Sequence, residues 1–520
     1  PGGQLPQHPC GQRDASGAVL GGLAMDVGAS LIGSLESVRD WWQQYPYTCL
    51  EQTASQALAL ADIKRWDSVL ARMATHGDDD GLLRYFPGTG PGSEVLTAYV
   101  VSALDDAQQA GVAATVPDEL LERMLNGLQA FAEGRIQRGA RNEAGLQARR
   151  IMAMEALARH GRVTPALLSS VEVAPAQWST PTLVNWVSIL TRMPAGKKVD
   201  AALKQARSIL SARMSVSGMA LSFAATPLNA EPGLMATRVT SLARLMLTVM
   251  ERPEWQADLP RMARGLIEAQ SGGVWAITTE NLLAQLALQR FSAKFEGTPA
   301  HGAITAHIIP QGASERVMLS GETRQAALQL GWPLGEGGVR LQHEGTGTAW
   351  VSVRAQARMP EAALQNFGYR VERRVVPVQR HAEEGWSRGD IYRVEVDIHA
   401  REGASWVVLN DPIPAGAVIL GSGLGRDVRA VPQGEYADDY PPAFIERTAS
   451  AYRAYYDYLP AGRVSLRYTV RLNTVGTFAL PPTRVEALYR PDLHAEAPNA
   501  PIEVGPGSYD FAESPHVADQ

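Results

Sequence analysis

Two kinds of hydrophobic periodicity divide the chain. From Ser30 to about Phe291, apolar residues recur at helical spacing, and Gly and Pro residues interrupt them at short intervals. The starts of several predicted helices carry a polar or proline residue: Ser93, Pro117, Pro165, Pro181 and Thr279. Many short helices with little strand signal predict antiparallel helical hairpins arranged as a ring or a solenoid.

After residue 300, apolar and polar residues alternate instead. The runs Tyr392–Ile398 and Val464–Leu472 have period two, and Gly and Pro clusters separate such runs. We therefore expect a multi-domain protein with a helical domain, a small β module and a β-sandwich. The expected boundaries are a poorly ordered tail or a first part of the β module at 1–27, helices at 28–298, the β module at 299–362, the sandwich at 363–510 and a tail at 511–520.

Composition excludes several functional classes. The chain has 520 residues, which is too long for one ordinary core and indicates two to four domains. Its formal net charge of -6 argues against nucleic acid as the main partner, because phosphate binding requires a basic surface. No apolar run has the length of a membrane-spanning helix. No signal peptide is present and the first residue is Pro1, so we interpret the sequence as a processed or cloned fragment.

The two cysteines, Cys10 and Cys49, leave two interpretations open. They could form one disulfide, or Cys49 could have a special chemistry while Cys10 lies in a Pro/Gly-rich tail. Two cysteines exclude a disulfide-rich scaffold and a four-cysteine zinc site, and we expect no metal or cofactor.

The surroundings of Cys49 favour the second interpretation. Thr48 and Glu51 have the spacing of a capping box, which predicts a helix that starts at Cys49. Cys49 and Gln52 are then three residues apart on one helical face, so their side chains can meet. The helix N-terminus is expected to lower the pKa of Cys49. Its thiolate could attack the Gln52 carboxamide, expel ammonia and close a thiolactone ring, which would be a stored acyl donor.

The segment Tyr45–Gln52, Tyr-Pro-Tyr-Thr-Cys-Leu-Glu-Gln, resembles the thioester site of the α2-macroglobulin and complement family in its bacterial form. Further segments match that family in the same order along the chain: Leu96–Val100, Trp275–Asn281, His343–Gly347, Leu459–Gly462, Gly476–Phe478 and Ala487–Pro491. The resemblance implies an α/α toroid of helical hairpins as the thioester domain, a CUB-like β module and a macroglobulin-type β-sandwich. It also implies that a protease bait region and further macroglobulin domains lie outside this sequence.

The resemblance implies a protease trap that acts once, and not a turnover enzyme. The thioester would join Cys49 to Gln52 and capture lysine amines of attacking proteases, because we find no match to the histidine that directs complement thioesters to hydroxyl groups. The location would be the periplasm, with inner-membrane association of the full-length protein as an alternative, and periplasmic or envelope proteins as further partners. The residues expected to support or shield the thioester are Thr48, Glu51, Tyr45, Tyr47, Leu488 and Tyr489.

Three alternatives remain open. The segment Gln270–Trp275 also fits a Gln-Trp repeat of terpenoid cyclases, which share the helical toroid, but one copy is present and a cyclase would need a lipid-sized apolar cavity. A thiol hydrolase could use Cys49 with a basic partner such as a histidine. A structural module with an inactive thioester is the third alternative.

Overall fold

The computed structural model describes residues 2–4, 21–31, 35–88, 90–138, 143–297, 299–309, 314–330, 338–357, 366–381, 383–421 and 440–506. The chain divides into two compact units, Pro1–Pro360 and Glu361–Gln520. The first unit holds all the long helices and a β module, and the second unit is built from strands. None of the helices in the described ranges has the length and apolar character that a membrane crossing requires.

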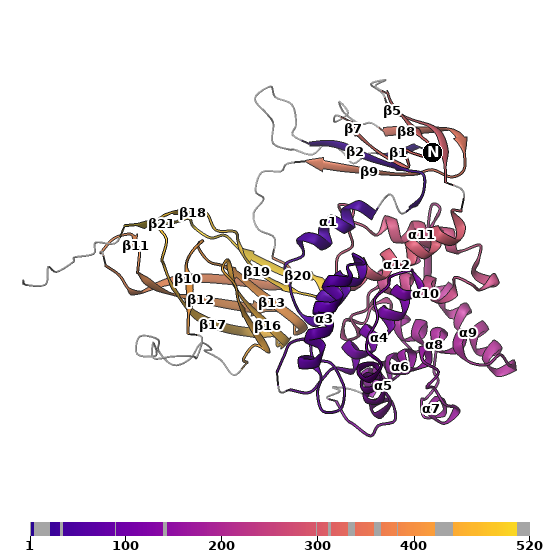
Figure 1. The fold of residues 1–520 in the computed structure, drawn as a ribbon, viewed down its shortest axis with the longest axis horizontal. Coiled ribbons are helices and arrows are strands. Elements are labelled where there is room, and N and C mark those ends of the chain that lie inside the picture. The colour runs from indigo at the N-terminus through magenta and orange to yellow at the C-terminus, as the bar shows by residue number, and fades with distance from the viewer. Residues whose placement is uncertain are drawn as a thin grey trace, which may run out of the picture. The chain divides into compact units, whose positions relative to one another are not determined.

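The helices of the first unit form a closed ring. Inner helices contact one another in the sequence α2–α4–α6–α8–α10–α12, and α12 contacts α2 again. Figure 1 shows α4, α6, α8, α10 and α12 packed together in the first unit. Outer helices cover them, with α3 on α2, α5 on α6, α9 on α8 and α11 on α10. The bounds are α1 Glu36–Gln44, α2 Leu50–Ala59, α3 Ile63–His76, α4 Glu94–Gln109, α5 Asp118–Ala132, α6 Glu143–Arg159, α7 Pro165–Ser169, α8 Thr180–Arg192, α9 Lys197–Arg213, α10 Arg238–Val249, α11 Leu259–Glu268 and α12 Thr278–Phe295.

Local sequence explains most helix starts. The Ser93 side chain accepts a hydrogen bond from the Leu96 N–H at 3.1 Å, so Ser93 caps α4 as predicted. Pro117 precedes α5, and Pro165 opens α7 in the position that tolerates a missing N–H. The expected cap at Thr279 is wrong, because α12 already begins at Thr278 and the Thr279 hydroxyl binds the Met235 carbonyl at 3.1 Å.

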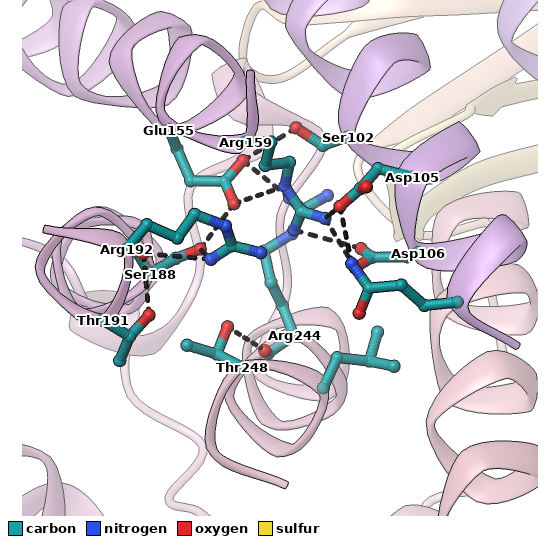
Figure 2. Close-up of polar contacts among 12 residues, drawn as sticks. Ser102, Asp105, Asp106, Glu155, Arg159, Ser188, Thr191, Arg192, Arg244 and Thr248 are labelled. Atoms are coloured by element: carbon teal, nitrogen blue, oxygen red, sulfur yellow. Dashed lines mark hydrogen bonds and ion pairs between the residues drawn. The ribbon is translucent and has the colours of Figure 1, made fainter. Parts of the chain in front are cut away.

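A buried ion-pair network joins four consecutive inner helices (Figure 2). Glu155 of α6 receives hydrogen bonds from Arg159 at 2.7 Å and from Ser188 of α8 at 2.6 Å. Arg159 also binds Asp106 of α4 at 2.7 Å, and Arg244 of α10 lies 3.5 Å from Glu155. Three arginines and three carboxylates come together in this network: Arg159, Arg192, Arg244, Asp105, Asp106 and Glu155.

The β module combines strands from before and after the helices. One sheet has the order β1–β8–β5–β6 and another the order β7–β2–β9. Strand β2 pairs with both β7 and β9, so residues 21–28 belong to this module. The Ala300 N–H binds the Ala29 carbonyl at 3.0 Å, which places the first and last residues of the helical insertion side by side. The bounds are β1 Gly2–Gln4, β2 Gly21–Gly28, β5 His301–Ile309, β6 Ser314–Leu319, β7 Gln325–Leu330, β8 Gly338–Thr346 and β9 Trp350–Ala357; a hairpin of β3 Met214–Ser217 and β4 Ala220–Phe223 lies among the helices.

The second unit contains sheets of order β10–β12–β17–β14, β15–β16–β13–β19–β20 and β11–β21–β18 around one apolar core. The two runs with period two lie in β12 and β17, which pair antiparallel, with Val394 opposite Tyr468. Their inward residues are fully buried, as strand alternation predicts. The bounds are β10 Tyr369–Gln379, β11 Trp386–Ser387, β12 Ile391–Ala400, β13 Ala404–Pro412, β14 Val418–Leu420, β15 Phe444–Arg447, β16 Ala451–Leu459, β17 Gly462–Arg471, β18 Gly476–Phe478, β19 Thr483–Ala487, β20 Arg490–Ala497 and β21 Ile502–Gly505.

Candidate functional site

Cys49 is the N-cap of α2, one residue outside the helix. The Leu50 N–H binds the Tyr85 carbonyl at 2.9 Å, which anchors the first turn of α2 to the segment before α4. The predicted capping box of Thr48 and Glu51 is wrong, because the reciprocal pair at this terminus is Cys49 and Gln52. Thr48 is exposed, and the helix begins at Leu50.

The capping pair brings the thiol and the carboxamide over the same turn. The Cys49 backbone N–H donates a hydrogen bond to Gln52 Oε1 at 3.2 Å. The Cys49 sulfur in turn accepts from the backbone N–H of Gln52. Both side chains are 1% exposed. The Cys49 thiol and the Gln52 carboxamide are therefore held on one helix turn, in a site that excludes most water.

Burial reverses the expected change in the Cys49 pKa. Desolvation raises the pKa of the thiol well above its ordinary value, and the nearby Glu51 carboxylate raises it further. Hydrogen bonds from the Gln52 and Glu51 backbone N–H groups, together with Arg72, lower it by less. The expectation that the helix N-terminus lowers this pKa is therefore wrong, because the dipole is outweighed by the loss of water.

Glu51 points into the ring interior and not toward the helix cap. Its carboxylate accepts hydrogen bonds from Ser55 at 2.7 Å and from Thr278 of α12 at 2.9 Å. The Ser55 hydroxyl also lies 2.7 Å from the Tyr99 hydroxyl of α4. Glu51 is thus connected to the helices on both sides of α2, and these contacts fix the orientation of the turn that carries Cys49.

The Glu51 contacts explain two segments that the sequence singled out without a role. Tyr99 lies in the segment Leu96–Val100, and Thr278 lies in the segment Trp275–Asn281. Sequence reasoning missed Ser55, Tyr99 and Thr278 as site residues. The four-residue spacing from Glu51 to Ser55 was the available local signal, whereas the other two contacts depend on the closure of the ring.

Tyr45 lies against the amide of Gln52. Gln52 Nε2 donates a hydrogen bond to the Tyr45 hydroxyl oxygen at 3.2 Å. The Tyr45 ring is half-buried among other aromatic rings, with centroid distances of 4.6 Å to Trp41 and 5.6 Å to Tyr47. Tyr47 is buried. The structure therefore places both tyrosines at the motif, and Tyr45 contacts the Gln52 carboxamide directly.

Leu488 and Tyr489 belong to the second unit. They form the bend between β19 and β20, and both are buried. The Leu488 N–H binds the Trp406 carbonyl at 2.8 Å. A shielding role for these two residues stays a prediction. Cys10, the other cysteine, lies outside the described residues.

The geometry weakens two of the alternatives. Inside the ring, the cavity lined by Tyr99, Arg244 and Leu283 has a volume of about 30 Å³, whereas pockets for drug-sized ligands hold roughly 300–1,000 Å³. In the segment that resembles a cyclase repeat, the Trp275 indole N–H donates a hydrogen bond to the Leu266 carbonyl at 2.8 Å, so the Trp275 side chain has a structural role. Glu51 and Arg72 are the charged side chains that act most strongly on Cys49, and neither is the histidine that a thiol hydrolase would use. Among the described residues, no group of three His, Cys, Asp or Glu side chains is arranged to hold a metal ion.

Replacing Glu51 with glutamine should change both stability and thiol acidity. The variant loses a charge that accepts two buried hydrogen bonds, so the free energy of unfolding should fall by about 1–3 kcal/mol. Removing the negative charge should also lower the Cys49 pKa. The measurement is the pH dependence of Cys49 alkylation in protein treated with excess amine. An alkylation midpoint that stays where it is in the parent would contradict the electrostatic coupling.

The chain as a whole is similar to several known proteins. Residues 368–492 match the family described as the bacterial alpha-2-macroglobulin MG10 domain. The alpha-2-macroglobulin of Xylella fastidiosa is 25% identical over 505 residues, which cover 89% of this chain and 29% of that protein. A crystal structure of native alpha-2-macroglobulin from Escherichia coli, spanning domain MG7 to the C-terminus, superposes with a TM-score of 0.71 at 21% identity, covering 97% of this chain and 81% of that chain. The chain is bacterial alpha-2-macroglobulin-like.

Two more relatives extend this comparison. An alpha-2-macroglobulin homolog from Nostoc is 22% identical over 439 residues, covering 79% of this alpha-2-macroglobulin-like chain and 22% of the relative. Salmonella alpha-2-macroglobulin reacted with methylamine superposes with a TM-score of 0.69 at 18% identity, covering 97% of this chain and 33% of that chain. The chain thus spans between a fifth and a third of the length of the curated relatives, and it corresponds to their C-terminal part.

Proposed function

We propose that Cys49 and Gln52 form an internal thioester that captures attacking proteases covalently. The observation that carries this proposal is the paired burial of the two side chains over one helix turn, with Gln52 Oε1 3.2 Å from the Cys49 backbone nitrogen. The likeness to alpha-2-macroglobulins supports a protease-trap role in general. The Salmonella relative has been crystallised after reaction with methylamine, which is the reagent that opens a thioester.

The chemistry of the proposed site consists of one storage step and one transfer step. In storage, the Cys49 sulfur bonds to the Gln52 side-chain carbonyl carbon, and ammonia leaves. In transfer, a lysine amine of the target bonds to the same carbon, and Cys49 leaves as a free thiol. Capture consumes the stored bond, so each molecule acts once and the protein is not a turnover enzyme. The buried position of Cys49 and Gln52 protects the bond from water during storage.

The architecture fits this assignment. We infer that the closed ring of α2, α4, α6, α8, α10 and α12 is the α/α toroid of the thioester domain, because α2 carries the motif at its start. The β module that holds the ring as an insertion is then the CUB-like module. The proposed location is the periplasm, where such a trap would meet proteases that attack the cell. Leu488 and Tyr489 of the second unit are proposed to shield the stored bond.

An adduct experiment tests capture. The chain is mixed with a lysine-rich protease, and products are separated under denaturing and reducing conditions and mapped by mass spectrometry. We expect an amide between a protease lysine and Gln52, together with one newly alkylatable thiol at Cys49. A matched protease with dimethylated lysines should give no adduct, because a dimethylated lysine cannot form a stable amide. Adducts of equal yield with both proteases would contradict lysine capture.

A further inference from the structure

The Gln52 amide is oriented by two different hydrogen bonds. Its oxygen faces the Cys49 backbone N–H at 3.2 Å, and its nitrogen faces the Tyr45 hydroxyl at 3.2 Å. Only an acceptor can face a backbone N–H, so the oxygen and the nitrogen cannot exchange places. The carbon between them is therefore held with its oxygen toward a donor and its leaving nitrogen toward a phenol.

Tyr45 is held in this position from several sides. It is the C-cap of α1, and its backbone N–H binds the Trp42 carbonyl at 3.4 Å. Its ring packs at 4.6 Å from the Trp41 ring, in a tilted arrangement, and edge-on to Tyr47. A phenol fixed by its own backbone and by flanking rings is preorganised for proton transfer to a group within hydrogen-bond reach.

Because the geometry places a proton-carrying group at the leaving nitrogen, we infer that Tyr45 is a catalytic residue of thioester chemistry. Its hydroxyl passes a proton between the Cys49 sulfur and the Gln52 nitrogen, while the Cys49 backbone N–H stabilises the oxyanion that forms on Gln52 Oε1. This inference rests on the proposed thioester. It assigns Tyr45 a chemical role in addition to the shielding that its ring could provide.

The step balances without any co-reactant. As sulfur bonds to the Gln52 carbon, the amide loses its conjugation and the nitrogen gains a basic lone pair. The Tyr45 hydroxyl, which accepted a hydrogen bond from the planar amide, now donates its proton to that nitrogen. The carbon–nitrogen bond breaks and ammonia leaves. The proton lost by the Cys49 thiol restores the phenol, directly or through one water, so the net transfer runs from sulfur to nitrogen.

The same path must operate in reverse when an amine opens the thioester. The attacking amine takes the place of Gln52 Nε2 and gives its proton to Tyr45, and Tyr45 gives its own proton to the departing sulfur. The raised pKa of Cys49 makes this second transfer favourable, since the thiolate is a poor leaving group in a buried site. General acid–base catalysis of this kind contributes about 10²- to 10⁴-fold in rate.

Tyr45→Phe separates the two roles, because it removes the hydroxyl and keeps the ring. Closed protein is opened with ammonia, which regenerates Gln52, and ammonia is then removed so that the ring closes again. Intact mass and thiol titration follow both directions in the full chain. We expect both rates to fall by about 10²-fold in Tyr45→Phe. The matched control is Tyr392→Phe, which removes the hydroxyl of a buried tyrosine in β12 of the second unit; it should retain the parent rates.

The outcomes are distinct. A Tyr45→Phe variant that melts like the parent and reacts at the parent rates would overturn the inference and leave only the shielding role. Tyr45→Ala provides a second test through the closing rate. If Tyr45 only shields the bond, this variant should open faster than the parent and close at the parent rate. If Tyr45 transfers a proton, the variant should close slowly. If the parent itself never contains a closed ring, the proposed function fails, and this result differs from a failure confined to the Tyr45 variants.

Discussion

Replacing Glu155 with alanine should lower the free energy of unfolding of the helical ring by about 3–5 kcal/mol, which is the usual cost of removing one partner from a buried ion pair. Glu155 is 0% exposed and binds Arg159 at 2.7 Å and Ser188 at 2.6 Å. Without it, Arg159 and Arg244 lose a common counter-charge inside the ring (Figure 2). Denaturant unfolding followed by far-UV circular dichroism measures the effect.

Glu119→Ala is the matched control for this variant. Glu119 is an exposed carboxylate in the first turn of α5, so its loss should change stability by about 0.5 kcal/mol or less. A Glu155→Ala variant that is as stable as Glu119→Ala would contradict the claim that the network holds the ring together.

The Glu155→Ala variant should also be less sensitive to acid than the parent. Burial alone would raise the pKa of Glu155, but Arg159, Arg244 and Arg192 outweigh burial and lower the pKa to about 2 from its usual value of 4.5. A depressed carboxylate pKa stabilises the folded state above the unfolded-state pKa, and this stabilisation is lost as the pH falls through the folded-state value. Between about pH 5 and pH 2, the Glu155→Ala variant should therefore lose less stability than the parent.

Replacing Cys49 with alanine should abolish covalent amine incorporation, because no other group can leave from the Gln52 carbonyl in the proposed mechanism. The chain supplies its own matched control in Cys10→Ala, which removes the second cysteine and should keep full incorporation. Labelled methylamine and peptide mapping around Gln52 measure both. Incorporation that survives in Cys49→Ala, or that is lost in Cys10→Ala, would contradict the assignment. Loss of amine incorporation in Cys10→Ala would favour a role for a Cys10–Cys49 pair.

The sequence alone predicts the features that depend on local patterns. Residues within a few positions of one another determine three such features. These are the helix starts at Ser93 and Pro117, the strands around Val394 and Tyr468, and the same-face spacing of Cys49 and Gln52. These signals arise from capping, from proline geometry and from strand alternation, which need no tertiary contact.

Other features require the closed ring. Glu155 and Arg159 have the i,i+4 spacing of an ordinary surface ion pair, and only the packing of α4, α8 and α10 around them makes the pair buried. Glu51 was expected to form part of the helix cap, but its carboxylate accepts a hydrogen bond from Thr278. This contact also depends on the closed ring, because Thr278 lies in α12, at the other end of the helical domain in sequence. The sign of the Cys49 pKa shift was wrong because burial is a tertiary property that the motif does not encode.

The intact mass of freshly purified protein, before and after methylamine, tests the central claim most directly. The account predicts that the untreated chain weighs one ammonia less than its sequence and that Cys49 resists alkylation in it. Methylamine should then add one molecule of amine at Gln52 and expose one thiol. An untreated chain with the full sequence mass, with Gln52 unmodified on peptide mapping and Cys49 already alkylatable, would contradict a thioester between these two residues.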